Sequence, residues 1–174
     1  MPDEDSETLF KNWLHAYGGT VLKVARAYTL TAEEREDLVQ EILLQLWRSL
    51  PQFEGRASAS TWVYRVALNT ALGWHRKEGR RRARQQPLLE PEELPVAALD
   101  SAEQLQQREV VERLYAAIRQ LPKAEAALVL LYLEDLSYRE IAEVLGISEG
   151  NVGVKLNRAR KALGELMKEV VYES

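Results

Sequence analysis

The chain has 174 residues, of which 46% are hydrophobic, and a formal net charge of −4 at pH 7; this length suffices for one domain or two small ones, and the apolar share excludes global disorder. No run approaches the ~20 apolar residues of a transmembrane helix, and the acidic residues 1–5 are unlike a signal peptide. The chain has no cysteine, which excludes disulfides, thiolate metal sites and cysteine nucleophiles, so we expect a cytoplasmic protein without membrane contact of its own.

The charge is distributed unevenly along the chain. Residues 71–86 carry six basic side chains and one acidic one, whereas residues 1–70, 87–121 and 122–174 each have a net negative charge. Nucleic acids respond to a local basic patch rather than to the total charge, so a nucleic-acid-binding protein is not excluded.

Helical periodicity dominates the sequence and no convincing strand alternation occurs, so we expect an all-α fold. The first helical region is expected over about Glu7–Tyr28, and Gly18 with Gly19 are poor helix formers that could interrupt it.

The second helix has the clearest signals. Thr31 and Glu34 form a capping box, in which Glu34 should accept the backbone N–H of Thr31, and Pro51 should stop the helix after Leu50. At 100° per residue, six apolar residues share one face, namely Leu38, Val39, Ile42, Leu43, Leu46 and Leu50. The opposite face collects Asp37, Gln40, Glu41, Leu44 and Arg48.

A loop over residues 53–60 precedes a third helix, expected over about Thr61–Lys77, which runs into a basic stretch at residues 76–84. One stripe of this helix suits burial and contains Val63, Ala67, Thr70 and Trp74, whereas a neighbouring face carries Trp62, Arg65, Asn69 and Arg76. Such a face, with Phe53 and the loop, could capture a base taken out of the stack, because aromatic rings stack on bases, arginines neutralise phosphate and an amide reads a base edge. Taken alone, the helix favours the simpler interpretation of core aromatics and a solvated basic end.

Residues 85–103 differ from their surroundings, because they contain three prolines and five acidic residues. They predict a flexible acidic linker between two small helical domains, over residues 7–84 and 104–170.

In the second domain, helices are expected over about Ala102–Gln120 and Lys123–Glu134. Residues 137–163 then predict a helix-turn-helix: a capping box at Ser137 and Glu140, a helix ending at Gly146, and a second helix capped by Ser148 with Asn151 that continues to about Lys168. Between Gly150 and Gly164 this last helix has no acidic residue and four basic ones, Lys155, Arg158, Arg160 and Lys161. A plain helical hairpin with a solvated basic face is the alternative, but the combined signals favour a helix that enters the major groove of DNA.

Both domains together resemble a bacterial RNA polymerase sigma factor of the extracytoplasmic-function group. In the first domain the resemblance rests on residues 37–42, 46–48, 53–55 and 60–69, and in the second on residues 121–122, 136–148, Val152, Leu156 and 158–161. It covers roughly residues 9–84 and 105–168, and two independent motif sets at the family's separation make it specific.

The resemblance implies partners and site residues. Core RNA polymerase would bind the second helix through Asp37, Gln40, Glu41, Leu44, Trp47 and Arg48. A solvated face would explain these charges but not the exposed leucine, which suits a mixed interface. The promoter −10 element would be melted and read by Phe53, Trp62, Arg65, Asn69, Arg76, Arg80 and Arg81. The −35 element would be read by Ser148, Asn151, Gly153, Val154, Lys155, Asn157, Arg158, Arg160 and Lys161. The linker would thread through the polymerase cleft, an anti-sigma factor is an expected partner, and the free chain should be a monomer.

The sequence departs from the family at three positions expected to face the groove. Gly153 and Val154 stand where a basic residue and a serine are common, and Asn157 replaces an often larger side chain. The −35 sequence therefore cannot be carried over from the family.

Two other functional classes fit the sequence less well. An enzyme is disfavoured because the paired carboxylates lie in a cap and in the linker, no phosphate-binding glycine loop occurs, and His15 and His75 lack ligand spacing, so neither catalytic residue, metal nor cofactor is expected. A conventional repressor or activator would use its first domain for ligand binding or dimerisation, and would bind duplex DNA without core polymerase.

Overall fold

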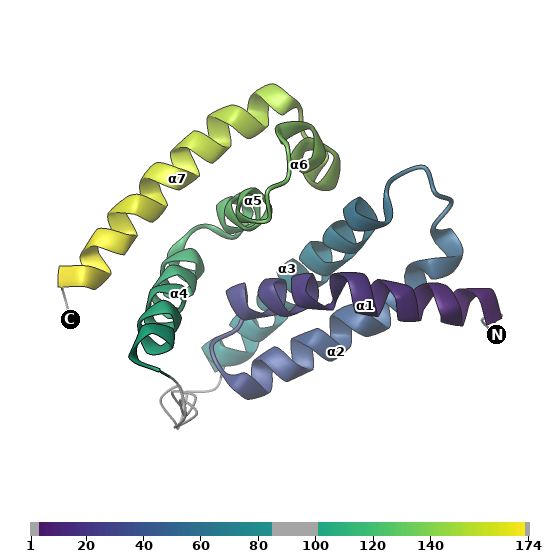
Figure 1. Cartoon of the computed structure of the whole chain (residues 1–174), viewed down its shortest axis with the longest axis horizontal. Helices are drawn as coiled ribbons and strands as arrows, with labels where there is room; N and C mark the ends of the chain where they lie inside the picture. Colours follow the sequence, from purple (N-terminus) through teal and green to yellow (C-terminus); the bar gives the residue numbers. More distant parts are fainter. Residues whose placement is uncertain (1–3, 85–100, 173–174) are drawn as a thin grey trace. The chain divides into compact units, whose positions relative to one another are not determined.

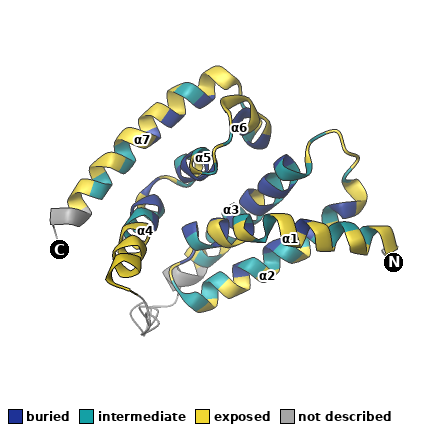
Figure 2. Ribbon diagram, viewed as in Figure 1, coloured by how far each residue is buried: buried dark blue, intermediate teal, exposed yellow. Residues whose placement is uncertain are grey.

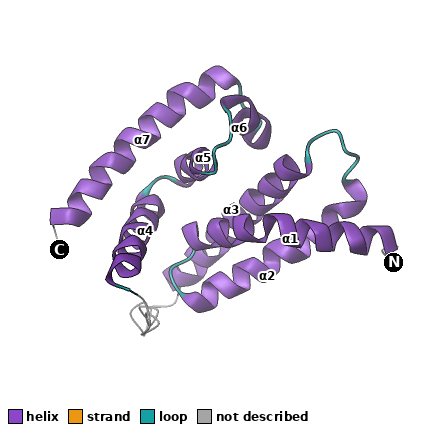
Figure 3. Ribbon diagram, in the orientation of Figure 1, coloured by secondary structure: helices purple, strands orange, loops and turns teal. Residues whose placement is uncertain are grey.

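The computed structural model describes residues 4–84 and 101–172, and every regular element in these ranges is a helix (Figure 3). The contacts divide the chain into two compact units, Met1–Glu92 and Glu93–Ser174 (Figure 1). The predicted all-α class with two helical units is therefore confirmed. The predicted linker lies for the most part at residues 85–100, outside the described residues.

The first unit is a bundle in which α1 (Glu4–Ala27), α2 (Ala32–Ser49) and α3 (Ala59–Arg84) each pack against the other two. Its buried apolar side chains come from all three helices (Figure 2): Trp13, Val21, Val24, Leu38, Ile42, Leu46, Val63, Tyr64, Ala67, Leu68 and Ala71. Burial of each large apolar side chain contributes about 1.5–3 kcal/mol, so this shared core holds the bundle together.

Helix α1 is continuous through Gly18 and Gly19, which the sequence suggested as an interruption. Each glycine costs a helix about 1 kcal/mol relative to alanine. Trp13 lies before the pair and Val21 after it, and both are buried. Their burial outweighs the cost of the glycines, because a helix anchored on both sides by core side chains gains nothing by breaking.

The N-terminus of α2 has a cap that differs from the predicted one in one partner. The Thr31 hydroxyl accepts the N–H of Glu34 at 3.1 Å, as expected. The Glu34 carboxylate, however, accepts the N–H of Leu30 at 2.8 Å instead of that of Thr31. The Glu34 side chain is long enough to reach the peptide before Thr31, so the side chains of Thr31 and Glu34 still each accept one backbone N–H at the start of the helix.

The apolar face of α2 is buried along its centre, at Leu38, Ile42 and Leu46, whereas Val39 and Leu43 are half-buried at its edge. Pro51 ends α2 as predicted, and the chain continues as a short 3₁₀ helix, η1 (Leu50–Gln52).

Helix α3 is longer than the predicted Thr61–Lys77, because it begins at Ala59 and runs through the basic stretch to Arg84. Arginine and alanine are good helix formers, and the next strong helix breaker is Pro87. The basic residues therefore extend the same helix that carries Trp62 and Asn69.

In the second unit, α7 (Glu149–Tyr172) packs against α4 (Ala102–Gln120), α5 (Lys123–Leu133) and α6 (Tyr138–Leu145). Residues 126–131 of α5 are all buried. A helix enclosed on all sides has no polar face, which explains its continuous apolar sequence.

Helix α4 spans Ala102–Gln120, as expected, and Ser101 with Gln104 forms a capping box at its start that the sequence analysis did not identify. This start lies inside residues 85–103, the segment assigned to the linker. Helix α7 extends to Tyr172, four residues past the expected Lys168.

None of the helices described combines the length and the apolar character that a membrane crossing requires. Over residues 4–84 and 101–172, no three side chains of the metal-binding types come close enough together to hold an ion.

Candidate nucleic-acid and polymerase interfaces

The outer face of α2 presents the residues expected to bind polymerase. Leu44 is 41% exposed, and Asp37, Gln40 and Arg48 are exposed around it. Glu41 is half-buried and its carboxylate accepts the amide of Gln45 at 2.9 Å. The surface thus combines one accessible leucine with charges of both signs.

Trp47, assigned to the same interface, is half-buried. Its ring lies edge-on to that of Phe10 in α1, with 5.1 Å between the ring centroids. Trp47 therefore ties α2 to α1 and offers a partner only part of its surface.

A stripe along α3 carries the residues expected to read the −10 element. Asn69, Arg76 and Arg80 are exposed, whereas Trp62 and Arg65 are half-buried. At 100° per residue these five fall within about one sixth of the helix circumference. The stripe has a polar reader and two exposed guanidinium groups on one surface, and the side chain of Arg81 lies outside the described ones.

An aromatic cluster anchors the loop before α3. The Phe53 ring lies edge-on to Trp13 of α1 at 5.0 Å and to Trp62 of α3 at 5.5 Å between centroids. The Trp62 indole N–H also donates to the Ser49 hydroxyl at 3.0 Å. Phe53 and Trp62 are thus held in the bundle, which fits the simpler interpretation of Trp62 as a core aromatic, whereas the contacts of Phe53 were not predicted. Stacking of either ring on a base stays a prediction.

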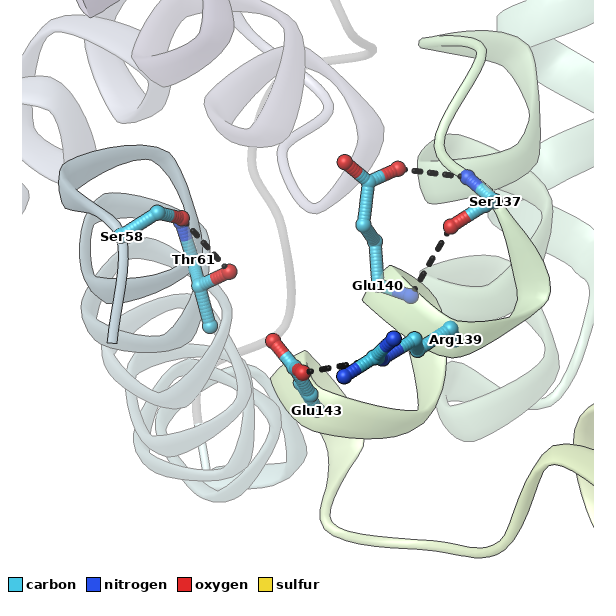
Figure 4. A network of polar contacts seen from close by, with 6 residues as sticks. All are labelled: Ser58, Thr61, Ser137, Arg139, Glu140 and Glu143. Atoms are coloured by element: carbon cyan, nitrogen blue, oxygen red, sulfur yellow. Dashed lines mark hydrogen bonds and ion pairs between the residues drawn. The ribbon is translucent and has the colours of Figure 1, made fainter. Parts of the chain in front are cut away.

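The loop is fixed at both ends and exposed at its tip. At its end, Ser58 caps α3: its hydroxyl accepts the N–H of Thr61 at 3.1 Å and donates to the Thr61 hydroxyl at 3.0 Å (Figure 4). At its tip, Gly55 has φ +74°, and the exposed side chains of Glu54 and Arg56 form an ion pair at 2.9 Å. The tip thus presents one side chain of each charge to solvent.

The predicted helix-turn-helix forms from α6 and α7. Ser137 and Glu140 exchange both capping hydrogen bonds, at 3.2 and 2.7 Å (Figure 4). Gly146 ends α6 in the left-handed conformation at φ +69°, which glycine adopts without steric cost. The Ser148 hydroxyl then accepts the N–H of Asn151 at 3.2 Å and starts α7.

Helix α6 carries its own exposed ion pair, in which the Arg139 Nε lies 3.8 Å from a Glu143 carboxylate oxygen (Figure 4). A pair this exposed contributes little to stability. The Glu143 carboxylate offsets the positive charge of Arg139, so this part of α6 adds little net positive charge to the helix-turn-helix.

Helix α7 separates an apolar face from a DNA-compatible one. Val152, Leu156 and Ala159 are fully buried, whereas Val154 is 63% exposed. The other predicted −35 residues that are exposed are Ser148, Asn151, Lys155, Asn157, Arg158, Arg160 and Lys161. Since residues 150–164 contain no carboxylate, the charged side chains on the exposed face of this stretch are all basic.

Two tyrosines that the sequence analysis did not single out cover one flank of α7. Gly153, expected to face the groove, is half-buried, and a Cβ on it would lie 3.5 Å from the ring of Tyr138 in α6. The guanidinium carbon of Arg160 lies 4.9 Å above the ring centroid of Tyr132 in α5. Positions 153 and 160 are seven residues apart and therefore lie on the same flank of α7. This spacing is the only feature of the sequence that points to a shared environment for the two residues.

Comparison with known proteins gives two family matches. Residues 13–81 match the family described as Sigma-70 region 2, and residues 111–163 match Sigma-70, region 4. The first match covers α3 with its exposed stripe, and the second covers the helix-turn-helix.

Curated relatives and solved structures agree with these matches. The chain is 30% identical to the RNA polymerase sigma-H factor of Pseudomonas aeruginosa over 165 residues, covering 91% of this chain and 86% of that protein. It is 33% identical to the ECF RNA polymerase sigma-E factor of Haemophilus influenzae, covering 73% of this chain and 71% of that protein.

Among solved structures, the sigma factor RpoE from Bartonella quintana, in complex with the anti-sigma factor NepR, has a similar fold, with a TM-score of 0.71, 22% identity, and coverage of 91% of this chain and 96% of that one. CnrH, in complex with the cytosolic domain of CnrY, has a TM-score of 0.65 at 20% identity, covering 94% and 90%. The chain therefore belongs to the sigma-70 family of RNA polymerase sigma factors, in its extracytoplasmic-function group, and is a promoter-specific transcription initiation factor.

Proposed function

We propose that this chain binds core RNA polymerase through the outer face of α2 and reads promoters with two separate surfaces, one in each unit. The exposed Leu44 supports the α2 assignment, because an accessible leucine framed by charges suits a partly apolar protein interface. In this proposal Trp47 contributes the part of its ring that Phe10 leaves accessible.

The observation that carries the proposal is the two-sided character of α7. Its inner face, with Val152, Leu156 and Ala159, is fully buried, and its outer face between residues 150 and 164 has four basic residues and no acidic one. A helix in the major groove has phosphates on both sides, so this arrangement suits −35 recognition. Asn157 and Val154 are then the candidates for base contact, since Gly153 lies under Tyr138.

For the −10 element, we assign base capture to the exposed loop tip together with Asn69. Phe53 and Trp62 hold the loop against the bundle, and the accessible part of Phe53 lines the captured base. Arg76 and Arg80, both exposed, neutralise the flanking phosphates. Opening of the duplex needs a polar group that reads the base, a ring that lines it and cations that neutralise the phosphates, all in one place. In this proposal α3 and its loop provide all three.

We further propose that the chain acts as a monomer in the cytoplasm, without catalysis of its own, and that an anti-sigma factor holds it inactive. The support for this last partner is that one structure of similar fold was solved as a sigma factor in complex with an anti-sigma factor. We assign the two domains to residues 4–84 and 101–172, which extends the expected 7–84 and 104–170 because α1 begins at Glu4, Ser101 caps α4 and α7 ends at Tyr172.

The proposal is tested by transcription from a promoter library with core polymerase, with and without the purified chain. We expect the chain to select a set of promoters that share −10 and −35 sequences. Binding of the chain alone to duplex promoters as a dimer, with no effect of core polymerase, would instead indicate a conventional repressor.

A further inference from the structure

The cation–π contact on α7 distinguishes Arg160 from its neighbours. Its guanidinium carbon lies 4.9 Å above the centroid of the Tyr132 ring, well inside the ~6 Å range of such contacts. Arg158 lies two residues away, hence roughly 160° around the helix, and faces away from this ring. Both arginines are exposed.

The Tyr132 ring projects from a firmly packed backbone. It belongs to α5, whose preceding six residues, 126–131, are all buried, and the ring itself is half-buried. The core fixes the backbone that carries the ring, because this backbone cannot move without disturbing the packing of those residues.

Stacking leaves the hydrogen-bonding edge of Arg160 available. A guanidinium group stacks through its flat face, and its N–H donors point outward in its plane, where they match the oxygens of a phosphate. A free arginine loses rotamer freedom when it binds, whereas a stacked one has already lost part of it.

We propose that Tyr132 is a positioning residue that orients Arg160 in advance for a DNA backbone phosphate beside the −35 element. This inference rests on the proposed docking of α7 in the major groove. Tyr132 itself need not touch DNA, and its effect is on affinity, not on sequence preference.

The test measures binding of the full chain, assembled with core polymerase, to a promoter duplex over a range of KCl concentrations. Replacing Tyr132 with leucine removes the π face and keeps an apolar side chain. We expect Tyr132→Leu to weaken binding roughly 2- to 12-fold at every −35 sequence, which is the range for immobilising one flexible side chain. The salt slope should stay unchanged, because Arg160 still reaches the phosphate, and Tyr132→Phe should bind like the wild type.

A double-mutant comparison separates positioning from simple loss of structure. Arg160→Ala should lower the salt slope by about one unit, and adding Tyr132→Leu to it should weaken binding no further. Arg158→Ala is the matched control, and its effect should add to that of Tyr132→Leu. If Tyr132→Leu reduces helicity, Arg160→Lys replaces it, since lysine keeps the charge and the slope but stacks poorly.

Wild-type affinity in both Tyr132→Leu and Arg160→Lys, or additive losses in Tyr132→Leu combined with Arg160→Ala, would overturn the inference alone. If scrambling the −35 element leaves wild-type affinity unchanged and Arg160→Ala leaves the salt slope unchanged, the docking of α7 is wrong and the inference fails with it.

Discussion

Asn69 allows the proposed strand-opening surface to be tested without disturbing the fold. Asn69 lies well inside the length of α3, away from both helix ends, and its side chain is exposed on the same stripe as Arg76 and Arg80. We expect Asn69→Ala to remove a polar base contact, because an amide can pair with a base edge through two hydrogen bonds. Such a pair contributes about 1–3 kcal/mol, so the equilibrium for opening should fall roughly 5- to 150-fold.

The same change should slightly stabilise the protein. Alanine is a better helix former than asparagine by about 0.5 kcal/mol, and no packing is lost at an exposed position. For a unit of about 80 residues the melting temperature should rise by about 2–4 °C. Opening and stability therefore move in opposite directions, which a general loss of structure cannot reproduce.

The assay is permanganate footprinting of unpaired thymines in promoter complexes, combined with thermal unfolding of each variant. Asn12→Ala is the matched control, because Asn12 is also an exposed amide inside a helix, in α1. It should raise the stability similarly and leave thymine reactivity unchanged. Wild-type reactivity in Asn69→Ala would refute the assignment of the melting surface to this stripe.

Three further predictions concern the other surfaces and the turn. Leu44→Asp should weaken binding to core polymerase by about 10-fold or more with unchanged circular dichroism, because Leu44 is 41% exposed and fills no core position; unchanged affinity in a binding titration would exclude α2 as the interface. Lys155→Ala should weaken DNA binding at all sequences and lower the salt slope by about one unit, whereas Asn157→Ala should change the preference at one position of a selected −35 library; identical preference matrices would mean that α7 docks differently. Gly146→Ala should lower the free energy of unfolding by about 1–2 kcal/mol, because residue 146 has a φ of +69°. Gly164→Ala should raise the free energy of unfolding by up to about 1 kcal/mol, because a Cβ at this position inside α7 meets open space. Both values are measured by urea unfolding, and a loss of stability at both positions would contradict this account.

Local chemistry in the sequence determined most helix ends. The hydroxyl caps at Thr31, Ser137 and Ser148 and the glycine at Gly146 act over three or four residues, so their partners are readable from spacing alone. Periodicity likewise identified the buried face of α2, and the combined motifs identified the family. The Ser101 cap was equally readable and was missed because the acidic composition of the preceding residues outweighed it.

Tertiary structure alone decided which side chains of the candidate surfaces are already in use. Phe53 contacts Trp13 across 40 positions of sequence, Arg160 lies over Tyr132, and Gly153 lies under Tyr138. The pattern within one helix shows which residues share a face, but it does not show which residue of another helix lies opposite that face. Packing between distant segments thus separates the exposed amides and guanidinium groups that are available to DNA from the aromatic rings that hold them in place.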